Sequence, residues 1–261
     1  MDELRRFRLD GRVALVAGGS GGIGVRLCEA FAGVGAKVAI VGRSEQRLQA
    51  ARKAVGAVGG EALVLAGDMT LGADADRVVA QTVDKWGRLD AVVNAIGGGA
   101  GTALYPAQDY PESEWDRIVD LNLRSQFLVS KAAASAMIAA DNGGRILNIS
   151  SVRGQLGIDN GFSAYVAAKG AMNALTRQHA TEWAKHGVTV NAISPTFVRT
   201  PQVEDLLADE NFTTALYKRI PLGRIAETDD LVGAALFFCS DASGFVTGQV
   251  LTLDGGLTAT Q

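Results

Sequence analysis

A tyrosine and a lysine, Tyr165 and Lys169, stand four residues apart in a stretch of helical character. Residues with this spacing lie on one face of a helix, one turn from each other. An ammonium group near a phenol favours the phenolate and lowers the tyrosine pKa from about 10 toward the working range. A phenol tuned in this way suits a general acid for a carbonyl oxygen. As an isolated pair, the two residues would also suit a plain surface or core position.

Two further polar residues join this pair. Ser151 stands fourteen residues before Tyr165, just after the apolar run 145–149, where its hydroxyl can reach the same carbonyl oxygen as the phenol. Asn122 lies in a long apolar helical segment, where an amide is out of place unless it bonds a specific partner. The four residues together indicate acid–base chemistry at a carbonyl or hydroxyl carbon.

A glycine-rich turn follows the first apolar run and precedes an amphipathic segment. Glycine permits positive φ and close backbone approach, so such a turn can hold a pyrophosphate on main-chain N–H groups at a helix N-terminus. A tight turn without a ligand is the plainer alternative. The residues predicted to contact the pyrophosphate are Gly18, Ser20, Gly21, Gly22, Ile23 and Gly24.

The second apolar run ends in Arg43 and Ser44, with no acidic residue before Glu45. In dinucleotide-binding folds an acid at this place bonds the adenosine ribose, whereas a basic residue accommodates a 2′-phosphate. The Arg43 guanidinium could form a bidentate pair with that phosphate, while the Ser44 hydroxyl donates a hydrogen bond to it. The sequence therefore favours NADP(H), with NAD(H) possible, unless Arg43 only caps a solvated turn.

The elements that must position these residues alternate along the chain. Seven short, mostly apolar runs predict strands at 13–17, 37–41, 62–66, 91–95, 145–149, 188–193 and 250–253. Helical periodicity predicts helices at 22–34, 45–58, 73–86, 112–140, 163–186 and 229–239. Strands that are apolar on both faces and alternate with helices predict an α/β fold, a doubly wound seven-stranded parallel sheet with helices on both faces. The length of 261 residues favours a single domain, 1–261.

Two long irregular stretches, 97–111 and 195–227, each follow a predicted strand. Ligands of open α/β sheets bind beyond the carboxyl ends of the strands. We therefore expect the substrate between these stretches, with 195–227 as the substrate loop.

Composition excludes several classes of protein. The chain has 25 basic and 28 acidic side chains, a net charge of −3, so we expect no nucleic-acid partner. Its 48% apolar content excludes disorder. Cys28 and Cys239 lack the spacing of a disulfide framework or a zinc site, and no apolar run suits a signal peptide or a membrane span. We expect a cytoplasmic protein with no metal and no membrane partner.

In this order the motifs resemble the short-chain dehydrogenase/reductase superfamily, in its compact form of about 250 residues. The resemblance runs from the first strand nearly to the last residue, and it implies a Rossmann fold and NAD(P)-dependent hydride transfer between a secondary alcohol and its ketone. Ala17 and Thr196 depart from the family pattern, which usually has threonine and glycine there. The supporting motifs are Gly18-x-x-x-Gly22-x-Gly24, Asp68, Asn94 to Gly97, Asn122, Ser151, Tyr165-x-x-x-Lys169, 195–200 and 247–256.

The resemblance also implies a role for each matching residue. Tyr165 would be the acid/base and Ser151, the second of two adjacent serines, would orient the substrate oxygen. Lys169 would bind the nicotinamide ribose and lower the tyrosine pKa, and Asn122 would hold a water of the proton relay. The remaining residues implied for the cofactor are Asp68 and Met69 at the adenine, Asn94, Ala95, Ile96 and Gly97 at the fourth strand, and Ile193, Pro195, Thr196, Val198 and Thr200 near the carboxamide.

The residues expected at the substrate are rich in polar groups. Arg153 could form a bidentate pair with a carboxylate, which favours a sugar acid or polyol, or it could face an adjacent subunit. A 3-oxoacyl-(acyl-carrier-protein) reductase is the first alternative, although the turn 140–144 is not basic, as an acidic carrier would require. A non-catalytic dinucleotide-binding sensor or scaffold is the second. The expected lining residues are Gly98, Gly99, Arg153, Gln155, Leu156, Phe197 and Gln202.

Two segments are apolar where a monomer would expose them. The helical segment 112–140 is apolar or small around much of its circumference, and the strand 250–253 should be a sheet edge. Two self-complementary patches generate D₂ symmetry, so we expect a homotetramer.

Overall fold

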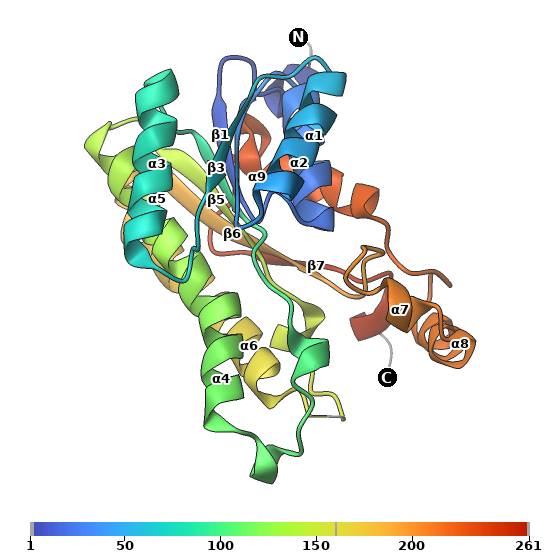
Figure 1. Ribbon diagram of the computed structural model, residues 1–261. Helices are drawn as coiled ribbons and strands as arrows, with labels where there is room; N and C mark the ends of the chain where they lie inside the picture. The colour runs from blue at the N-terminus through green and yellow to red at the C-terminus, as the bar shows by residue number, and fades with distance from the viewer. Residues whose placement is uncertain (1–2, 160, 260–261) are drawn as a thin grey trace.

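The computed structural model describes residues 3–159 and 161–259. Its seven strands form one sheet with the order β3-β2-β1-β4-β5-β6-β7 (Figure 1). Every neighbouring pair is parallel. The strands are β1 Val13–Ala17, β2 Lys37–Gly42, β3 Ala62–Ala66, β4 Ala91–Asn94, β5 Gly144–Ile149, β6 Val188–Pro195 and β7 Val250–Leu253.

Helices cover both faces of the sheet, which confirms the predicted doubly wound Rossmann fold. Alternate strand residues point to opposite faces, so Val16 packs toward one helical layer and Leu15 toward the other. One layer contains α1, α2 and α9, and the other contains α3, α5 and part of α6 (Figure 1). The helices are α1 Gly22–Gly33, α2 Glu45–Ala57, α3 Gly72–Trp86, α4 Glu112–Val119, α5 Ser125–Ala139, α6 Ser163–Trp183, α7 Glu204–Leu207, α8 Glu210–Arg219 and α9 Val232–Cys239.

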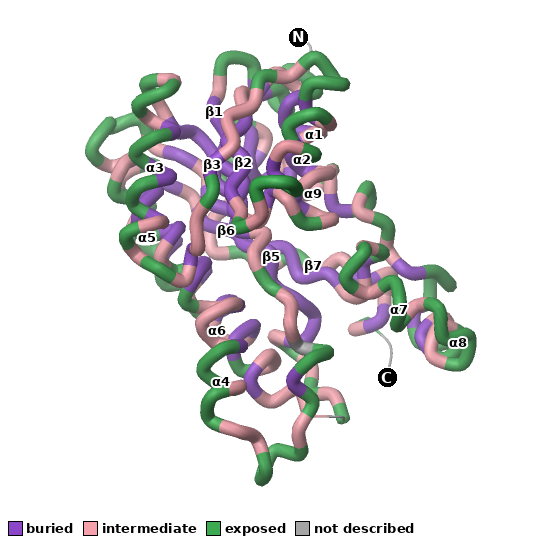
Figure 2. Tube along the Cα trace, in the orientation of Figure 1, coloured by how far each residue is buried: buried purple, intermediate pink, exposed green. Residues whose placement is uncertain are grey.

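The core lies in the sheet and on the inner faces of these helices. The residues of β1 are 0–1% exposed, and Figure 2 shows the central strands buried while the outward helix faces are exposed. Near the ends of strands β5 and β6, smaller apolar clusters replace the main core around α4 and α8. The sheet is therefore covered by the main hydrophobic core, whereas the segments beyond its carboxyl end rest on smaller apolar clusters.

Two predicted segments differ in the structure. The single helix expected at 112–140 is α4, a π-helical turn Asp120–Arg124 and α5. The stretch 195–227, expected to be irregular, contains α7 and α8. Asp209 caps α8 by accepting hydrogen bonds from the N–H groups of Asn211 and Phe212, a local signal for a helix start.

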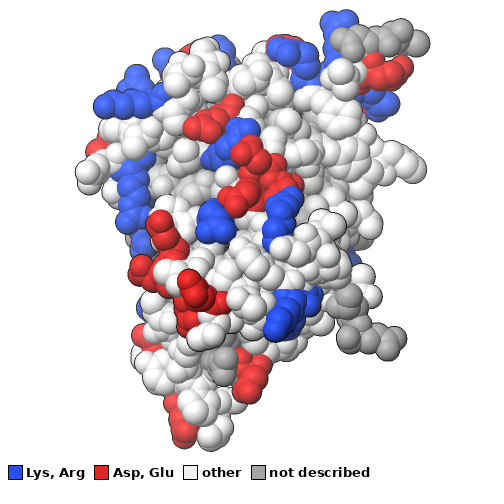
Figure 3. Space-filling model, turned by 90° about the vertical axis from the view of Figure 1, so that its right-hand side faces the viewer, with Lys and Arg blue, Asp and Glu red and all other residues white. Residues whose placement is uncertain are grey.

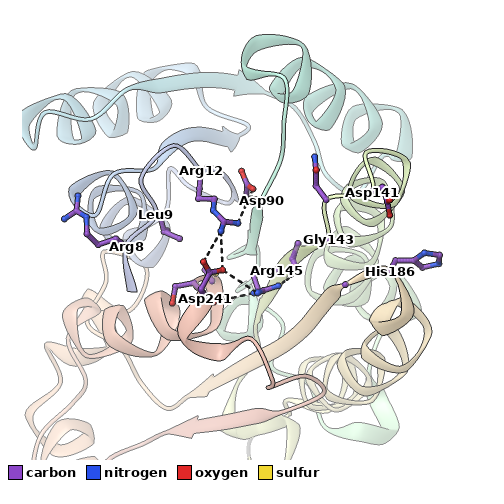
Figure 4. Close-up of a pocket in the computed structure, with 14 residues that line it drawn as sticks. Arg8, Leu9, Arg12, Asp90, Asp141, Gly143, Arg145, His186 and Asp241 are labelled. Atoms are coloured by element: carbon purple, nitrogen blue, oxygen red, sulfur yellow. Dashed lines mark hydrogen bonds and ion pairs between the residues drawn. The ribbon is translucent and has the colours of Figure 1, made fainter. Parts of the chain in front are cut away.

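A polar pocket of about 410 Å³ lies at the amino-terminal edge of the sheet (Figure 4). Arg12 Nη2 lies 3.0 Å from Asp241 and Arg12 Nη1 lies 3.5 Å from Asp90, while Arg145 lies 3.8 Å from Asp241. These charges neutralise one another and join the segment before β1 to the end of α9. The pocket is thus at the opposite edge from the carboxyl ends of the strands, and the charges of Arg12, Arg145, Asp90 and Asp241 in it are paired.

The surface shown in Figure 3 intersperses basic and acidic side chains without a continuous basic stripe. In the part of the chain that the structure describes, no helix combines the length and the apolar character needed to cross a membrane. Among the same residues, no three His, Cys, Asp or Glu side chains are grouped as metal ligands would be.

Candidate active site

The glycine turn fills the space between β1 and α1. Gly18 has φ +83°, and its N–H and that of Gly19 donate to the carbonyl of Val41 on β2. A Cβ at Gly18 would lie 2.6 Å from the Ala95 oxygen, and one at Gly24 would lie 2.1 Å from the Gly18 oxygen. Only glycine fits these two places. The N-cap of α1 is Gly21, which offers no side-chain cap, so the first N–H groups of the helix are left to a ligand or solvent.

The end of β2 carries the residues predicted to read the adenosine ribose. Arg43 is exposed, and no ion pair among residues 3–159 and 161–259 involves it. Ser44 is the N-cap of α2, with its hydroxyl accepting from the N–H of Arg47 at 3.5 Å. The side chain of Ser20 leans on Gly42, where a Cβ would lie 2.5 Å from its hydroxyl oxygen. The structure therefore brings the glycine turn and the β2 end together, with Arg43 unpaired.

The residues after β3 form a compact turn. The Asp68 carboxylate accepts hydrogen bonds from the N–H and hydroxyl of Thr70, at 3.0 and 2.8 Å. The N–H of Asp68 donates to Asp74 at 2.8 Å, and Met69 is 3% exposed. Asp68 is thus held by its own turn, and Met69 packs in the core under it.

Asn94 ends β4 and is fully buried. Its amide nitrogen donates to Ser130 and to Asn148, both at 2.8 Å. The side chain lies in the core between β4, β5 and α5, so its support of a cofactor is indirect. The N–H of Ala95 donates to Ala17 at 2.8 Å, which fixes where the segment from Ala95 to Gly97 leaves the sheet.

Ser151, Tyr165 and Lys169 meet where β5 ends and α6 begins. Lys169 is 2% exposed, and its ammonium donates to the Ile149 carbonyl at 2.9 Å. The Lys169 nitrogen lies 5.6 Å from the centroid of the Tyr165 ring. The Ser151 hydroxyl accepts from the N–H of Arg153 at 3.1 Å and is hydrogen-bonded to the Tyr165 phenol. The neighbouring Ser150 instead donates to Asn173 at 2.6 Å, so the two serines point to different surroundings.

The expected lowering of the tyrosine pKa by Lys169 is wrong for this structure. Burial raises the pKa of Tyr165 above its ordinary value, and the hydrogen bond with Ser151 and the charge of Arg153 oppose this only in part. Burial also lowers the pKa of Lys169 from 10.5 to about 8. The ammonium sits over the ring and bonds a backbone carbonyl. The phenol oxygen is therefore influenced by Ser151 and Arg153.

Asn122 occupies the π-helical turn and is fully buried. Its oxygen accepts from the N–H of Gly98 at 2.9 Å, and its nitrogen donates to the carbonyls of Gly98 and Ile118 at 2.9 and 3.0 Å. A Cβ at Gly97 would lie 2.9 Å from the Asn122 oxygen and 3.2 Å from the Lys169 nitrogen. The amide and the ammonium therefore converge on the same stretch of backbone after β4.

The segment after β6 crosses from the substrate side to the glycine turn. Val198 forms an isolated parallel bridge with Ala226. A Cβ at Gly22 would lie 2.8 Å from Thr200, and one at Gly98 would collide with the Gln202 amide. The Thr196 hydroxyl oxygen is buried and finds no hydrogen-bond partner among the described residues. Buried polar atoms are normally bonded, so this oxygen fits a missing ligand group such as a carboxamide. Together with the uncapped start of α1 and the unpaired Arg43, it fits a bound dinucleotide.

The predicted substrate residues divide into three sets. Arg153 is 8% exposed and lies beside Ser151. Leu156 and Phe197 pack with α8 in an apolar cluster. The Gln155 amide donates to Thr252 on β7 at 3.2 Å and to Ser194 on β6 at 3.5 Å. The Gln155 amide is therefore held at the edge of the sheet formed by β6 and β7, and its role at the substrate stays a prediction.

Gly99 completes the expected lining, from the segment after β4. It has φ +72°, and a Cβ there would lie 3.3 Å from Arg117 and Ile118 of α4. Gly99 therefore lies against side chains of the α4 region, and its positive φ favours glycine at this place.

Sequence reasoning missed Gln126. It is fully buried in α5, and its amide nitrogen donates to the carbonyls of Ile96 and Ile149, at 2.7 and 3.4 Å. It thus ties the ends of β4 and β5, and it shares the Ile149 carbonyl with Lys169. The signal was the one that singled out Asn122, an amide in an apolar helix, four residues further on.

Comparison with known proteins agrees with this geometry. The family model described as enoyl-(acyl carrier protein) reductase matches residues 17–258. Gluconate 5-dehydrogenase of Gluconobacter oxydans (strain 621H) is 39% identical over 255 residues, covering 97% of this chain and 96% of the relative. The 5-keto-D-gluconate 5-reductase of Escherichia coli (strain K12) is 34% identical and covers 96% of this chain and 97% of that protein.

A solved structure shares the whole architecture. The crystal structure of a gluconate 5-dehydrogenase from Burkholderia cenocepacia J2315, in complex with NADP and tartrate, has a TM-score of 0.92 and 34% identity, covering 99% of each chain. Both the family model and these relatives span nearly the full length of the protein. The chain therefore belongs to the short-chain dehydrogenase/reductase superfamily and is an NAD(P)-dependent oxidoreductase that interconverts hydroxyl and keto groups.

Proposed function

We propose that the protein oxidises a hydroxyl group of a small sugar acid, and reduces the matching keto acid, with NADP(H). The observation that carries the substrate class is Arg153, a guanidinium 8% exposed beside Ser151 that enters no ion pair among the described residues. A buried charge is costly unless an opposite charge meets it, and a carboxylate matches the guanidinium fork. The named relatives that act on gluconate or 5-keto-D-gluconate support the same class.

In the proposed reaction Tyr165 carries the proton and Ser151 orients the substrate. The nicotinamide, when bound, accepts the hydride from the alcohol carbon or returns it to the ketone. In oxidation the Tyr165 phenolate takes the proton of the substrate hydroxyl, and in reduction the Tyr165 phenol gives a proton to the oxygen of the ketone. The raised pKa of Tyr165 keeps the phenol protonated without cofactor, ready to donate in the direction of reduction. The Ser151 hydroxyl, bonded to the same phenol, holds the substrate oxygen in line.

Lys169 and Asn122 serve the cofactor side of this centre. The Lys169 ammonium is held by the Ile149 carbonyl and is placed to meet a ribose hydroxyl. The positive charge of the oxidised cofactor, once bound near the phenol, would lower the Tyr165 pKa toward the working range. Asn122 fixes the backbone at Gly98 and leaves Gly97 between its own oxygen and the Lys169 ammonium, which suits a water-linked proton path.

NADP(H) is the proposed cofactor because Arg43 stands exposed and unpaired where the 2′-phosphate would lie. The residues proposed to hold it come from four places. The glycine turn with Gly18 to Gly24 takes the pyrophosphate, and Asp68 and Met69 border the adenine. The segment from Ala95 to Gly97 and the segment from Pro195 to Thr200, within the substrate loop 195–227, border the nicotinamide half.

Steady-state turnover tests this function. Purified protein with NADP⁺ should oxidise D-gluconate faster than sorbitol, which lacks the carboxylate, and with NADPH it should reduce 5-keto-D-gluconate. Tyr165→Phe should lower kcat at least ~10²-fold, since general acid–base catalysis commonly contributes 10² to 10⁴. Activity on acetoacetyl thioesters and none on sugar acids would favour the acyl reductase alternative. No turnover of any ketone, with NADPH still bound, would favour a sensor or scaffold.

We also propose a homotetramer in a reducing cytoplasm. Leu251, on the edge strand β7, is 41% exposed and Phe127, on α5, is 38% exposed. A groove of about 480 Å³ between α3 and α5 is lined mainly by small apolar side chains. Both cysteines are buried and unpaired, which suits a reducing compartment. Light scattering should give four chains, and Leu251→Arg should give two; a mass of one chain for the unaltered protein would refute the assembly.

A further inference from the structure

The arginines around the substrate side differ in whether a carboxylate neutralises them. Three are paired within the described residues: Arg117 with Glu114 at 2.6 Å, Arg199 with Glu227 at 3.0 Å and Arg224 with Asp230 at 2.6 Å. In the same described ranges, neither Arg153 nor Arg219 takes part in an ion pair. Two positive charges are thus left without an acidic partner in a region where the other arginines have one.

Arg153 is the inner of the two. It follows Ser151 in a short 3₁₀ turn, and its N–H donates to the Ser151 hydroxyl at 3.1 Å. Within the residues that the structure describes, its guanidinium makes one hydrogen bond, to the Gly157 carbonyl at 3.3 Å. Burial lowers the pKa of Arg153, and the charge of Arg219 lowers it further. The positive charge of Arg219 thus acts unfavourably on the Arg153 guanidinium, and an anion bound by both groups would relieve that repulsion.

Arg219 is the outer one, on the last turn of α8. Leu216 and Ile220, on either side of it in the sequence, are 5% and 2% exposed. They pack in one cluster with Leu156 and Phe197, which places this face of α8 on the segment that follows Arg153. Residues three apart share a helix face, so Arg219, whose side chain is exposed, lies at the edge of the face on which Leu216 meets this segment.

We propose that Arg153 and Arg219 together bind the carboxylate of the substrate, while Ser151 and Tyr165 act on a hydroxyl farther along the same molecule. The inference rests on the proposed sugar-acid activity and adds a residue that no sequence motif indicates. Two guanidinium groups on separate elements fix a carboxylate in place and orientation more firmly than one. Arg219 is thus a specificity residue for acids over neutral polyols, and α8 must be seated for the acid to bind.

The test compares Arg219→Ala with Lys218→Ala. Both cations are exposed, but Lys218 is two residues from Leu216 and so lies on the opposite side of α8. With NADP⁺ present, Arg219→Ala should raise the KM for D-gluconate about 10- to 100-fold, as for a lost charge-assisted bond. Its kcat should stay within about threefold, and its kinetics with sorbitol should not change. Raising the salt concentration should raise the gluconate KM of the unaltered enzyme, and less so that of Arg219→Ala. Lys218→Ala should match the unaltered enzyme throughout.

Each outcome decides the matter. An unchanged gluconate KM in Arg219→Ala, in an enzyme that oxidises gluconate, overturns the arginine pair and leaves the proposed function standing. An equal rise of KM for gluconate and sorbitol also overturns it, because α8 would then act only through packing. If the unaltered enzyme oxidises sorbitol and no sugar acid, both the proposed function and the pair are wrong. Arg219→Lys, which keeps the charge, should restore part of the loss.

Discussion

Replacing Lys169 with methionine should make the fold more stable at neutral pH while removing the proposed contact with the cofactor. The side chain is 2% exposed, and burial lowers its pKa from 10.5 to about 8. At about 1.4 kcal/mol for each pKa unit, keeping this charge costs the folded chain about 3 kcal/mol at pH 7. Losing the hydrogen bond to the Ile149 carbonyl reduces this gain in stability by about 1 kcal/mol. The carbonyl keeps one donor, because Gln126 still donates to it at 3.4 Å. Lys169→Met should therefore raise the free energy of unfolding by about 2 kcal/mol.

The gain should depend on pH in one direction. Because the pKa of Lys169 is lower in the folded chain than in the unfolded chain, the unfolded chain holds more protons between pH 8 and pH 10.5. The cost of the charge is complete below about pH 8 and disappears as the pH rises toward 10.5. The advantage of Lys169→Met should thus be about 2 kcal/mol at pH 7 and near zero at pH 10.

Urea unfolding at both pH values, at one protein concentration without cofactor, measures this difference. Lys185→Met is the control, because Lys185 is exposed in the 3₁₀ turn that follows α6, and it should show no gain at either pH. A variant that is less stable than the unaltered protein at pH 7, or a gain of equal size at pH 7 and pH 10, would refute the reasoning that desolvation of the ammonium dominates.

Two further changes, each with a control, test the cofactor side. Arg43→Ala should weaken NADPH binding about 10- to 100-fold with little change for NADH, while Arg47→Ala changes neither; fluorescence titration would contradict this if both nucleotides lost affinity equally. Gly24→Ala should weaken NADPH binding at least ~10-fold and lower the melting temperature, because its Cβ would lie 2.1 Å from the Gly18 oxygen. Gly33→Ala, at the far end of the same helix with no atom within 4 Å of its Cβ, should be neutral or stabilising by up to about 1 kcal/mol.

The strands could be predicted to within two residues because each is a short, mostly apolar run bounded by polar or glycine residues. Both sheet faces are covered, so these runs needed no alternation to be recognised. The segment with α7 and α8 was harder. Its helices are short and rest on a small separate cluster around Leu216 and Ile220, so their apolar pattern covers few residues. Periodicity over so few residues does not separate helix from loop.

The site could be located from spacing, but its electrostatics could not. Four-residue spacing put Tyr165 and Lys169 on one helix face, as the structure has them. The pKa values depend on burial and on Arg153, whose position relative to the phenol is set by the turn after β5. Likewise, the π turn inside the predicted helix 112–140 lies where Asn122 forms hydrogen bonds with Gly98, a residue 24 positions away in the sequence.

The π turn at Asp120–Arg124 determines how α4 and α5 are oriented relative to each other. Each residue turns an α-helix by about 100°, so the wider π turn, with its one extra residue, shifts the phase of α5 against α4 by more than a quarter of a revolution. Ile118 before the turn packs with Ala164 of α6, while Val129 after it packs beneath the sheet. The continuous helical segment from α4 to α5 thus has two apolar faces that point in different directions. Asn122 lies at the turn where one face ends and the other begins. A single-residue deletion in this turn would rotate the substrate-side half out of alignment and leave the sheet-side half in place.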